Sequence, residues 1–312
     1  MLANIYRMRI PETPFYYQGK VELSQLNYRN NDLLDNYSDL FRLYNNHMIY
    51  LPLKLGFINF IPKAELGYIF YSSSLNESDL DRSYSSIGLE SSFQANKIIH
   101  KDKAWYGNGL RHVIKPYLDY EYSSYSTGTN FTFQYDKLDT FYNKNNIKIG
   151  LNQLFQTKRD NKNKRLIEID LYSYYSFDND KKDQSSDYLH ADAMFSLNDY
   201  LSVDYLAAID VYDNKSPYMM TRLRYNNSSI DLFLSHLKLR NNKSLFSTKL
   251  ELSPREDLVI DSYLRYNEEE NNIEQASITG YITNCCFEYG VGYRLSSRNE
   301  HQVIFSLRLS SF

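Results

Sequence analysis

Apolar and polar residues alternate with a period of two along most of the chain, and helical periodicity is almost absent. The alternation is clearest in four segments, whose apolar positions are Ala64, Leu66, Tyr68 and Phe70; Ile167, Ile169 and Leu171; Phe287, Tyr289, Val291, Tyr293 and Leu295; and Val303, Phe305, Leu307 and Leu309. The intervening residues are mostly small or charged, as at Glu65, Gly67, Asp170, Gly292 and Arg308. Because successive side chains of a strand point to opposite faces, each segment predicts a strand with one apolar face and one wet face.

Clusters of polar, turn-forming residues separate these segments. Examples are Asn30–Asp32, Asp160–Lys164, Asp178–Asp187, Asn241–Lys243 and Glu268–Asn272. The clusters recur about every 12 to 25 residues, which fits one strand plus one turn. This spacing predicts roughly 16 to 18 strands, and a tilted strand of about 9 to 11 residues is long enough to span a bilayer.

So many strands need closed edges, and in lipid every backbone N–H and C=O must be paired within the protein. We therefore expect an all-β, antiparallel transmembrane β-barrel that occupies residues 1–312 as one domain. A soluble β-sandwich, β-propeller or β-solenoid is the competing fold, although such folds usually contain more glycine, more proline and repeated motifs.

The composition is compatible with a barrel. The chain has 31 Tyr and 17 Phe but a single Trp, and its mean hydropathy of −0.57 would ordinarily indicate a soluble protein. Tyrosine forms strands and suits a membrane interface, and a barrel exposes only alternate residues to lipid. A net charge of −3 gives no reason to expect a nucleic-acid partner. The sequence contains no run of 18 apolar residues, so it predicts no transmembrane helix.

The N-terminal residues lack the uninterrupted apolar stretch of a signal peptide. Since an outer-membrane protein must be exported, we expect the chain to be truncated at its N-terminal side. A cytoplasmic protein would begin in the same way, and this is the main sequence feature that speaks against a membrane barrel.

Motifs of catalysis or metal binding are missing from the sequence. The histidines do not occur in HExxH or another metal-binding spacing, and neither GxSxG nor a glycine-rich phosphate loop is present. We therefore expect no enzyme, no metal and no cofactor. A barrel enzyme would need a His and a Ser or Asp brought together on one rim from different strands.

The last strand-like segment ends in Phe312. Many outer-membrane proteins end in an alternating strand with a terminal Phe, which the barrel-assembly machinery recognises. Here Phe312 is out of phase with Phe305 and Leu307 by one residue. The segment therefore predicts either such an assembly signal or a strand followed by a short tail.

Four segments resemble the LptD (OstA/Imp) family of lipopolysaccharide-assembly proteins. They contain the strings LPLKLGFINFIPKAELGY, RHVIKPYLDY, NIKIGLNQLFQTK and NCCFEYGVGYR, and they lie within Ile49–Tyr68, Gly109–Tyr120, Asp136–Lys158 and Asn284–Leu309. Their order and spacing together carry the resemblance, which extends over most of the chain.

The resemblance implies a bacterial outer-membrane barrel that inserts lipopolysaccharide into the outer leaflet without making or breaking bonds. The polar head of the glycolipid would cross the hydrophilic lumen, and its acyl chains would leave through a lateral seam. The implied partners are an LptE-like plug lipoprotein, an LptA-like periplasmic bridge docked on a missing N-terminal domain, and the barrel-assembly machinery during insertion.

Cys285 and Cys286 are the only cysteines of the chain. Neighbouring residues of a strand point to opposite faces, so the two thiols are poorly placed to bond each other. The resemblance implies disulfides from both to the missing N-terminal domain, as an oxidising compartment would favour. The alternative is two unpaired thiols that act as small apolar side chains.

Prolines are concentrated near the start, at Pro11, Pro14, Pro52 and Pro62. Proline cannot donate to a strand ladder, and the resemblance implies a lateral seam between early and late strands that prolines ease open. That seam would join the segment after Pro11 and Pro14 to the strand carrying Val303, Phe305, Leu307 and Leu309. Ordinary turn or strand-edge proline is the alternative interpretation.

A general porin-like channel is the main alternative function. It would need a lumen loop and no cysteine-linked domain, whereas a soluble β-protein would need a dry, apolar interior. The sequence does not fix which lumen residues contact a substrate, because a one-residue shift of register inverts every side chain.

Overall fold

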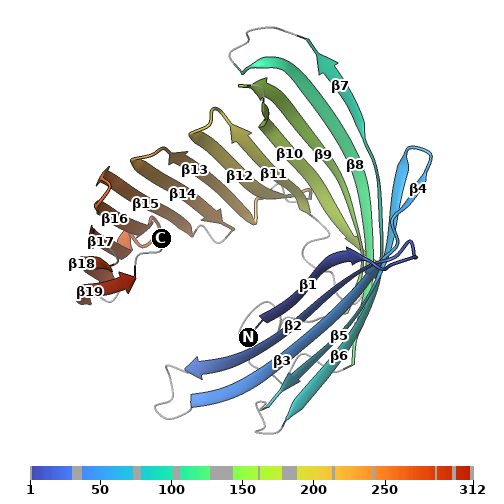
Figure 1. Ribbon diagram of the computed structural model, residues 1–312, viewed down its shortest axis with the longest axis horizontal. Helices are drawn as coiled ribbons and strands as arrows, with labels where there is room; N and C mark the ends of the chain where they lie inside the picture. The colour runs from blue at the N-terminus through green and yellow to red at the C-terminus, as the bar shows by residue number, and fades with distance from the viewer. Residues whose placement is uncertain are drawn as a thin grey trace. The chain divides into compact units, whose positions relative to one another are not determined.

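The computed structural model describes residues 2–29, 37–72, 79–100, 106–126, 143–160, 162–177, 188–212, 215–240, 243–284, 287–296 and 300–309. The regular elements of these residues are 19 β-strands (Figure 1), and the ladders between them are antiparallel. The all-β, antiparallel fold predicted from the sequence is confirmed. No helix among the described residues is long and apolar enough to cross a membrane.

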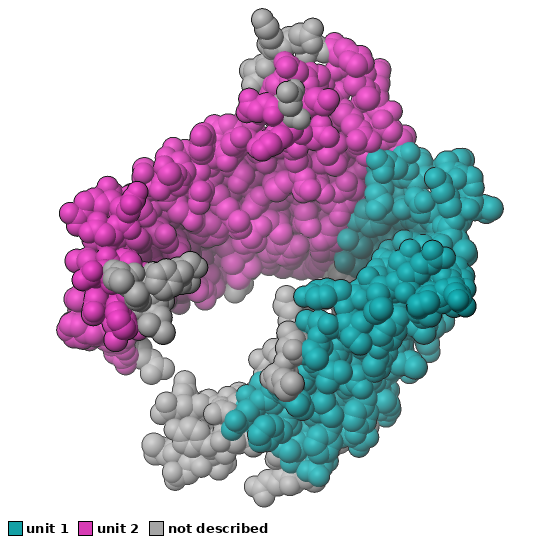
Figure 2. Space-filling view, viewed as in Figure 1, with its two compact units in different colours: residues 1–94, 115–150, 174–186 teal, residues 95–114, 151–173, 187–312 magenta. Residues whose placement is uncertain are grey.

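The chain divides into two compact units, which Figure 2 shows in different colours. Unit 1 comprises residues 1–94, 115–150 and 174–186, and unit 2 comprises residues 95–114, 151–173 and 187–312. Strands β8 (Asn108–Tyr125), β9 (Lys144–Arg159) and β10 (Lys162–Ser176) contribute residues to both units. A single domain over residues 1–312 stays a prediction.

The first strands form an antiparallel meander, apart from two places where two strands share one neighbour. They are β1 (Leu2–Arg9), β2 (Tyr16–Arg29), β3 (Tyr37–Tyr50), β4 (Leu53–Leu55), β5 (Ile58–Tyr71), β6 (Leu80–Phe93), β7 (Ala95–Ile99), β8 (Asn108–Tyr125), β9 (Lys144–Arg159) and β10 (Lys162–Ser176). Both β3 and β4 pair with β5, and both β6 and β7 pair with β8.

These two shared partners explain the strand number. Strand β3 is interrupted after Tyr50 because Pro52 lacks the N–H that a ladder requires. The chain resumes pairing, as β4, with the same neighbour. Similarly, the strand that ends at Phe93 resumes at Ala95 along the same neighbour. Counting each broken strand once turns 19 into 17, which lies within the predicted range. The structure offers no comparable physical reason for the break at Gln94.

The remaining strands continue the meander within unit 2. They are β11 (Tyr188–Ser196), β12 (Leu201–Asp210), β13 (Tyr218–Asn226), β14 (Ile230–Leu239), β15 (Ser244–Arg255), β16 (Leu258–Asn267), β17 (Asn272–Asn284), β18 (Phe287–Ser296) and β19 (His301–Leu309). Their ladders are regular over eight to ten residues, with irregularities at Leu252/Arg255 and Arg265/Tyr266. Such lengths are close to what a tilted strand needs to span hydrocarbon.

Connections differ in length between the two ends of the strands from β11 to β19. At one end, two residues separate Arg255 from Leu258 and four separate Ser196 from Leu201. At the other end, seven residues separate Asp210 from Tyr218. Membrane barrels commonly have short turns on the periplasmic side and longer loops outside the cell.

A small hydrophobic cluster lies on β3, β5 and β6 of unit 1. It consists of Leu40, Tyr44, Ile69, Tyr71 and Tyr84, and Leu26, Leu80 and Tyr125 pack against it. These residues belong to the face that also carries buried Arg42 and Arg82. The face predicted to be wet is therefore partly dry in unit 1.

Candidate functional site

Two chemically different faces run across the ladders of unit 2. One lateral row pairs Val303, Tyr293, Ile278, Ser262, Leu250, Leu232, Tyr225 and Leu201 in turn, without a charged side chain. The row next to it, shifted by one residue, pairs Ile304, Gly292, Thr279, Asp261, Glu251, Asp231 and Asn226. Shifting by one residue thus exchanges an apolar surface for an acidic one.

The same division holds in unit 1. Met8, Tyr17, Ile49, Ala64, Ile87 and Tyr122 form one row, and the adjacent row on β3, β5, β6 and β8 is Tyr50, Lys63, Gly88 and Glu121. The alternation of apolar and wet faces predicted for the segments at Ala64–Phe70 and Phe287–Leu295 is confirmed. We call these surfaces the apolar face and the polar face of each unit.

The residues predicted for a lateral seam lie at the two ends of the chain. Val303, Phe305 and Leu307 are on the apolar face of β19 with exposed fractions of 64%, 78% and 65%, which are among the highest of the apolar side chains. Only the backbone of Leu309 is described. Pro11 and Pro14 lie in the turn between β1 and β2, so they remove no ladder hydrogen bond. The seam itself stays a prediction.

Cys285 and Cys286 lie outside the described residues. Their neighbours Asn284 and Phe287 pair with each other at the end of the β17–β18 hairpin. The predicted disulfides to a further domain stay a prediction.

A hydrogen-bonded cluster spans the polar face of β3, β5 and β6 in unit 1. The hydroxyls of Tyr44 and Tyr84 lie 3.1 Å apart, Tyr84 donates to Glu65 at 3.0 Å, and Asn46 donates to Tyr44 at 2.8 Å. Asn46 also contacts Glu65 and Tyr84. The Tyr84 ring reaches Tyr44 by crossing β5 over Gly67, where a Cβ would collide with the ring. A buried polar cluster of this kind holds its members in one arrangement.

An ion-pair network lies beside this cluster. Lys63 on β5 contacts Glu90 on β6 at 3.0 Å and Asp119 on β8 at 3.1 Å. It crosses β6 over Gly88, where a Cβ would lie 2.5 Å from Cε of Lys63. The Lys63 side chain is only 18% exposed, so the two carboxylates compensate a largely desolvated charge.

The polar face of unit 2 carries further cross-strand pairs. Asp204 and Arg222 lie 3.4 Å apart across β12 and β13, and Arg265 contacts Glu274 at 2.8 Å. Lys249 contacts Asp261 at 3.9 Å. These half-buried to exposed pairs stabilise the fold little where water screens them, but they identify a face that requires water.

One group meets the adjacency that a barrel enzyme would need. His236 Nε2 lies 2.9 Å from Ser244 Oγ, which donates to Glu268 at 2.5 Å. This hydrogen bond holds the pKa of the Glu268 carboxyl below its usual value. The Ser244 proton is directed to the carboxylate rather than to the histidine, and Ser244 is buried. Because a nucleophilic hydroxyl must be accessible to its substrate, the buried Ser244 does not form a catalytic triad with these residues.

The described residues contain no cluster of His, Cys, Asp or Glu that could hold a metal ion.

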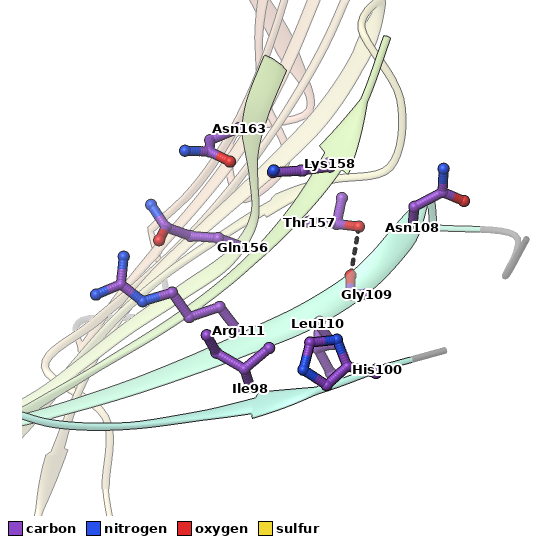
Figure 3. Close-up of a pocket in the computed structure, with 10 residues that line it drawn as sticks. All are labelled: Ile98, His100, Asn108, Gly109, Leu110, Arg111, Gln156, Thr157, Lys158 and Asn163. Atoms are coloured by element: carbon purple, nitrogen blue, oxygen red, sulfur yellow. Dashed lines mark hydrogen bonds between the residues drawn. The ribbon is translucent and has the colours of Figure 1, made fainter. Parts of the chain in front are cut away.

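A basic cavity of about 310 Å³ lies in unit 2 between the ends of β7 and β8 and the facing ends of β9 and β10 (Figure 3). Its lining includes His100, Arg111 and Lys158 together with the side-chain amides of Asn108, Gln156 and Asn163. Sequence reasoning missed this cavity. The signal in the sequence is the repeated lysines and arginines in residues 95–114 and 151–165, which match no motif of fixed spacing.

Comparisons with known proteins give structural likeness alone. No family model and no curated protein matches the chain. Among solved structures, a triple mutant of Rhodopseudomonas blastica porin is 12% identical with a TM-score of 0.41, covering 99% of both chains. A second variant of that porin is 10% identical with a TM-score of 0.43 at the same coverage. A structure titled for asymmetric conductivity of engineered proteins is 11% identical with a TM-score of 0.41, covering 94% of this chain and 97% of that one.

Proposed function

We propose that the chain is a bacterial outer-membrane barrel that acts as a porin-like channel for small hydrophilic solutes. The observation that carries the proposal is the pair of adjacent rows in unit 2, one without charge and one with Asp231, Glu251 and Asp261 side by side. An apolar outer belt requires lipid, and a charged inner wall requires water. Conduction through such a wall is non-enzymatic.

The acidic row predicts that the channel prefers cations to anions. Carboxylates along a pore wall concentrate cations and repel anions. We expect the refolded full chain to insert into planar bilayers and give ohmic current steps with a preference for cations.

The double variant Asp231→Asn/Glu251→Gln tests the acidic row. It should shift the reversal potential in a salt gradient toward zero, whereas Asp204→Asn, which breaks one ion pair elsewhere on the polar face, should change it less. A protein that inserts, shows heat-modifiable migration on gels and yet carries no current would argue against the channel.

The resemblance to the LptD family supports a second candidate, translocation of lipopolysaccharide through a lateral seam. The exposed apolar side chains of β19 fit a strand that meets acyl chains, and the proposal retains the LptE-like, LptA-like and assembly-machinery partners. Replacement of both Cys285 and Cys286 by Ser in cells should then reduce lipopolysaccharide at the cell surface. Unchanged surface lipopolysaccharide after depletion of the protein would leave the channel as the sole candidate.

A further inference from the structure

The basic cavity lies in a strongly basic part of the chain. Residues 95–114 and 151–165 contain nine Lys and Arg against two Asp, whereas the whole chain has a net charge of −3. Charges of one sign gathered in a concave surface raise the local concentration of counter-ions. Lys164 and Arg165 are paired with Asp199 and Glu168, and the remaining positive charges make this part of unit 2 attractive to anions although the protein as a whole is acidic.

The lining supplies donors and, among its described residues, no competing carboxylate. Arg111 and Lys158 contribute a guanidinium and an ammonium group, and the amides of Gln156 and Asn163 add neutral donors (Figure 3). Ile98 and Leu110 provide an apolar part of the wall. Such a combination suits a ligand with a compact anionic group attached to a less polar body.

Cross-strand contacts fix the walls of the cavity. Thr157, which is 4% exposed, donates its hydroxyl proton to the Gly109 carbonyl at 2.8 Å. Arg159 Nε donates to the Tyr106 carbonyl at 2.9 Å. Gly107 has a φ of 130°, and a Cβ there would lie 2.6 Å from the Lys158 carbonyl oxygen. The chain thus brings the start of β8 against the end of β9 only because glycine occupies this position.

We propose that this cavity binds a phosphate-bearing small ligand. A guanidinium matches two phosphate oxygens at once, and an ammonium adds a point charge from the neighbouring strand. A cavity of about 310 Å³ has room for the phosphate and for a glycerol or sugar unit attached to it. The phosphate could belong to a solute or to a lipid headgroup, since both present the same anion. This binding site goes beyond the proposed channel and does not depend on conduction.

Calorimetric titration of the full chain in neutral maltoside micelles tests the site, with inorganic phosphate and glycerol 3-phosphate as probes. We expect saturable binding that Arg111→Gln and Lys158→Gln each weaken by on the order of tenfold, because each removes a charge-assisted hydrogen bond. Lys238→Gln is the matched control. It removes a lysine from a second basic hollow of unit 2, lined by Lys215, Lys238 and Arg240, and should leave the affinity unchanged.

Two results would overturn the proposal: no binding by the unmodified chain, or equal weakening by Lys238→Gln, which would indicate general attraction to a basic surface. Heat-modifiable migration of each variant establishes that it is folded. Repeating the titration in nanodiscs of phosphatidylglycerol distinguishes a soluble phosphate ligand from a lipid headgroup. Loss of glycerol 3-phosphate binding there would indicate that a headgroup fills the cavity, and retained binding would indicate a soluble ligand.

Discussion

Among single residues, glycines on the polar face decide which side chains can reach across a strand. Gly67 leaves room for Tyr84, and Gly88 leaves room for Lys63, so that each long side chain contacts a strand two places away. Their role is steric, because both lie in extended strands. The cluster formed by Tyr44, Tyr84 and Glu65 depends on this space.

Replacing Gly67 by Val should displace the Tyr84 ring and break its hydrogen bonds to Tyr44 and Glu65. Overpacking of this kind costs about 1–3 kcal/mol of unfolding free energy, which urea titration of the protein in micelles can measure. Gly280→Val is the matched control, because a Cβ at Gly280 meets no atom within 4 Å. Equal destabilisation by both substitutions would show that the effect lies in the strand backbone and not in the tyrosine cluster.

The sequence predicted the faces of many residues but not their partners. Alternation alone placed Phe305 and Val291 on an apolar face, as the structure confirms. It could not place Tyr44 beside Tyr84, because that contact depends on the registers of two ladders and on the gap at Gly67. Register is set by turns and by packing along the whole ladder, and no local pattern encodes it.

Among the strands, the lateral rows are a consequence of unbroken register. From β11 to β15 the described ladders pair residue by residue, so an apolar row stays apolar over several strands. A slip of one residue in any ladder would carry Asp231 or Glu251 into the apolar face. The cost of placing charge in lipid therefore selects the register.

Ile278→Lys should destabilise the protein by about 2–4 kcal/mol, the cost of a lysine at the middle of the lipid face of a barrel. Thr283→Lys, on the opposite face of β17, should cost far less because Thr283 is only half-buried and faces Glu288 on the polar face. Folding into lipid vesicles, followed by gel shift at a series of urea concentrations, measures both. A larger loss for Thr283→Lys would reverse the assignment of the two faces.

Strand positions could be predicted from the sequence because the turn clusters are polar and regularly spaced. The predicted cluster at Glu268–Asn272 coincides with the connection from Asn267 to Asn272 that joins β16 to β17. The interruptions at Pro52 and Gln94 were not predicted as separate short strands. In the sequence, a proline near a strand end predicts a turn. In the structure, the strand resumes after Pro52 as β4.

For the molecule as a whole, the lengths of the connections predict an orientation in the membrane. The short turn between Arg255 and Leu258 should face the periplasm, and the connections at the opposite ends of the strands, including that between Asn267 and Asn272, should face the cell exterior.

The family resemblance found in the sequence has no counterpart in the comparisons with known proteins. Its transport function accordingly remains a proposal, because the segments that suggested it also describe ordinary barrel strands.

Cysteine labelling of intact cells tests this orientation. In a background with Cys285 and Cys286 replaced by Ser, Glu270→Cys should react with a membrane-impermeant maleimide, and Asp257→Cys should react only after the outer membrane is opened. The two positions lie beyond opposite ends of β16. The reverse labelling pattern would place the short turns outside the cell.

The side chains of Tyr84 and Lys63, which cross a strand over Gly67 and Gly88, also affect how the sheet unfolds under force. Tyr84 connects β6 to β3, and Lys63 connects β5 to β8, so the strands from β3 to β8 are fastened to second neighbours as well as to adjacent ones. A cantilever pulling on the N-terminus should therefore extract β1 and β2 stepwise and then release the braced strands in one larger rupture.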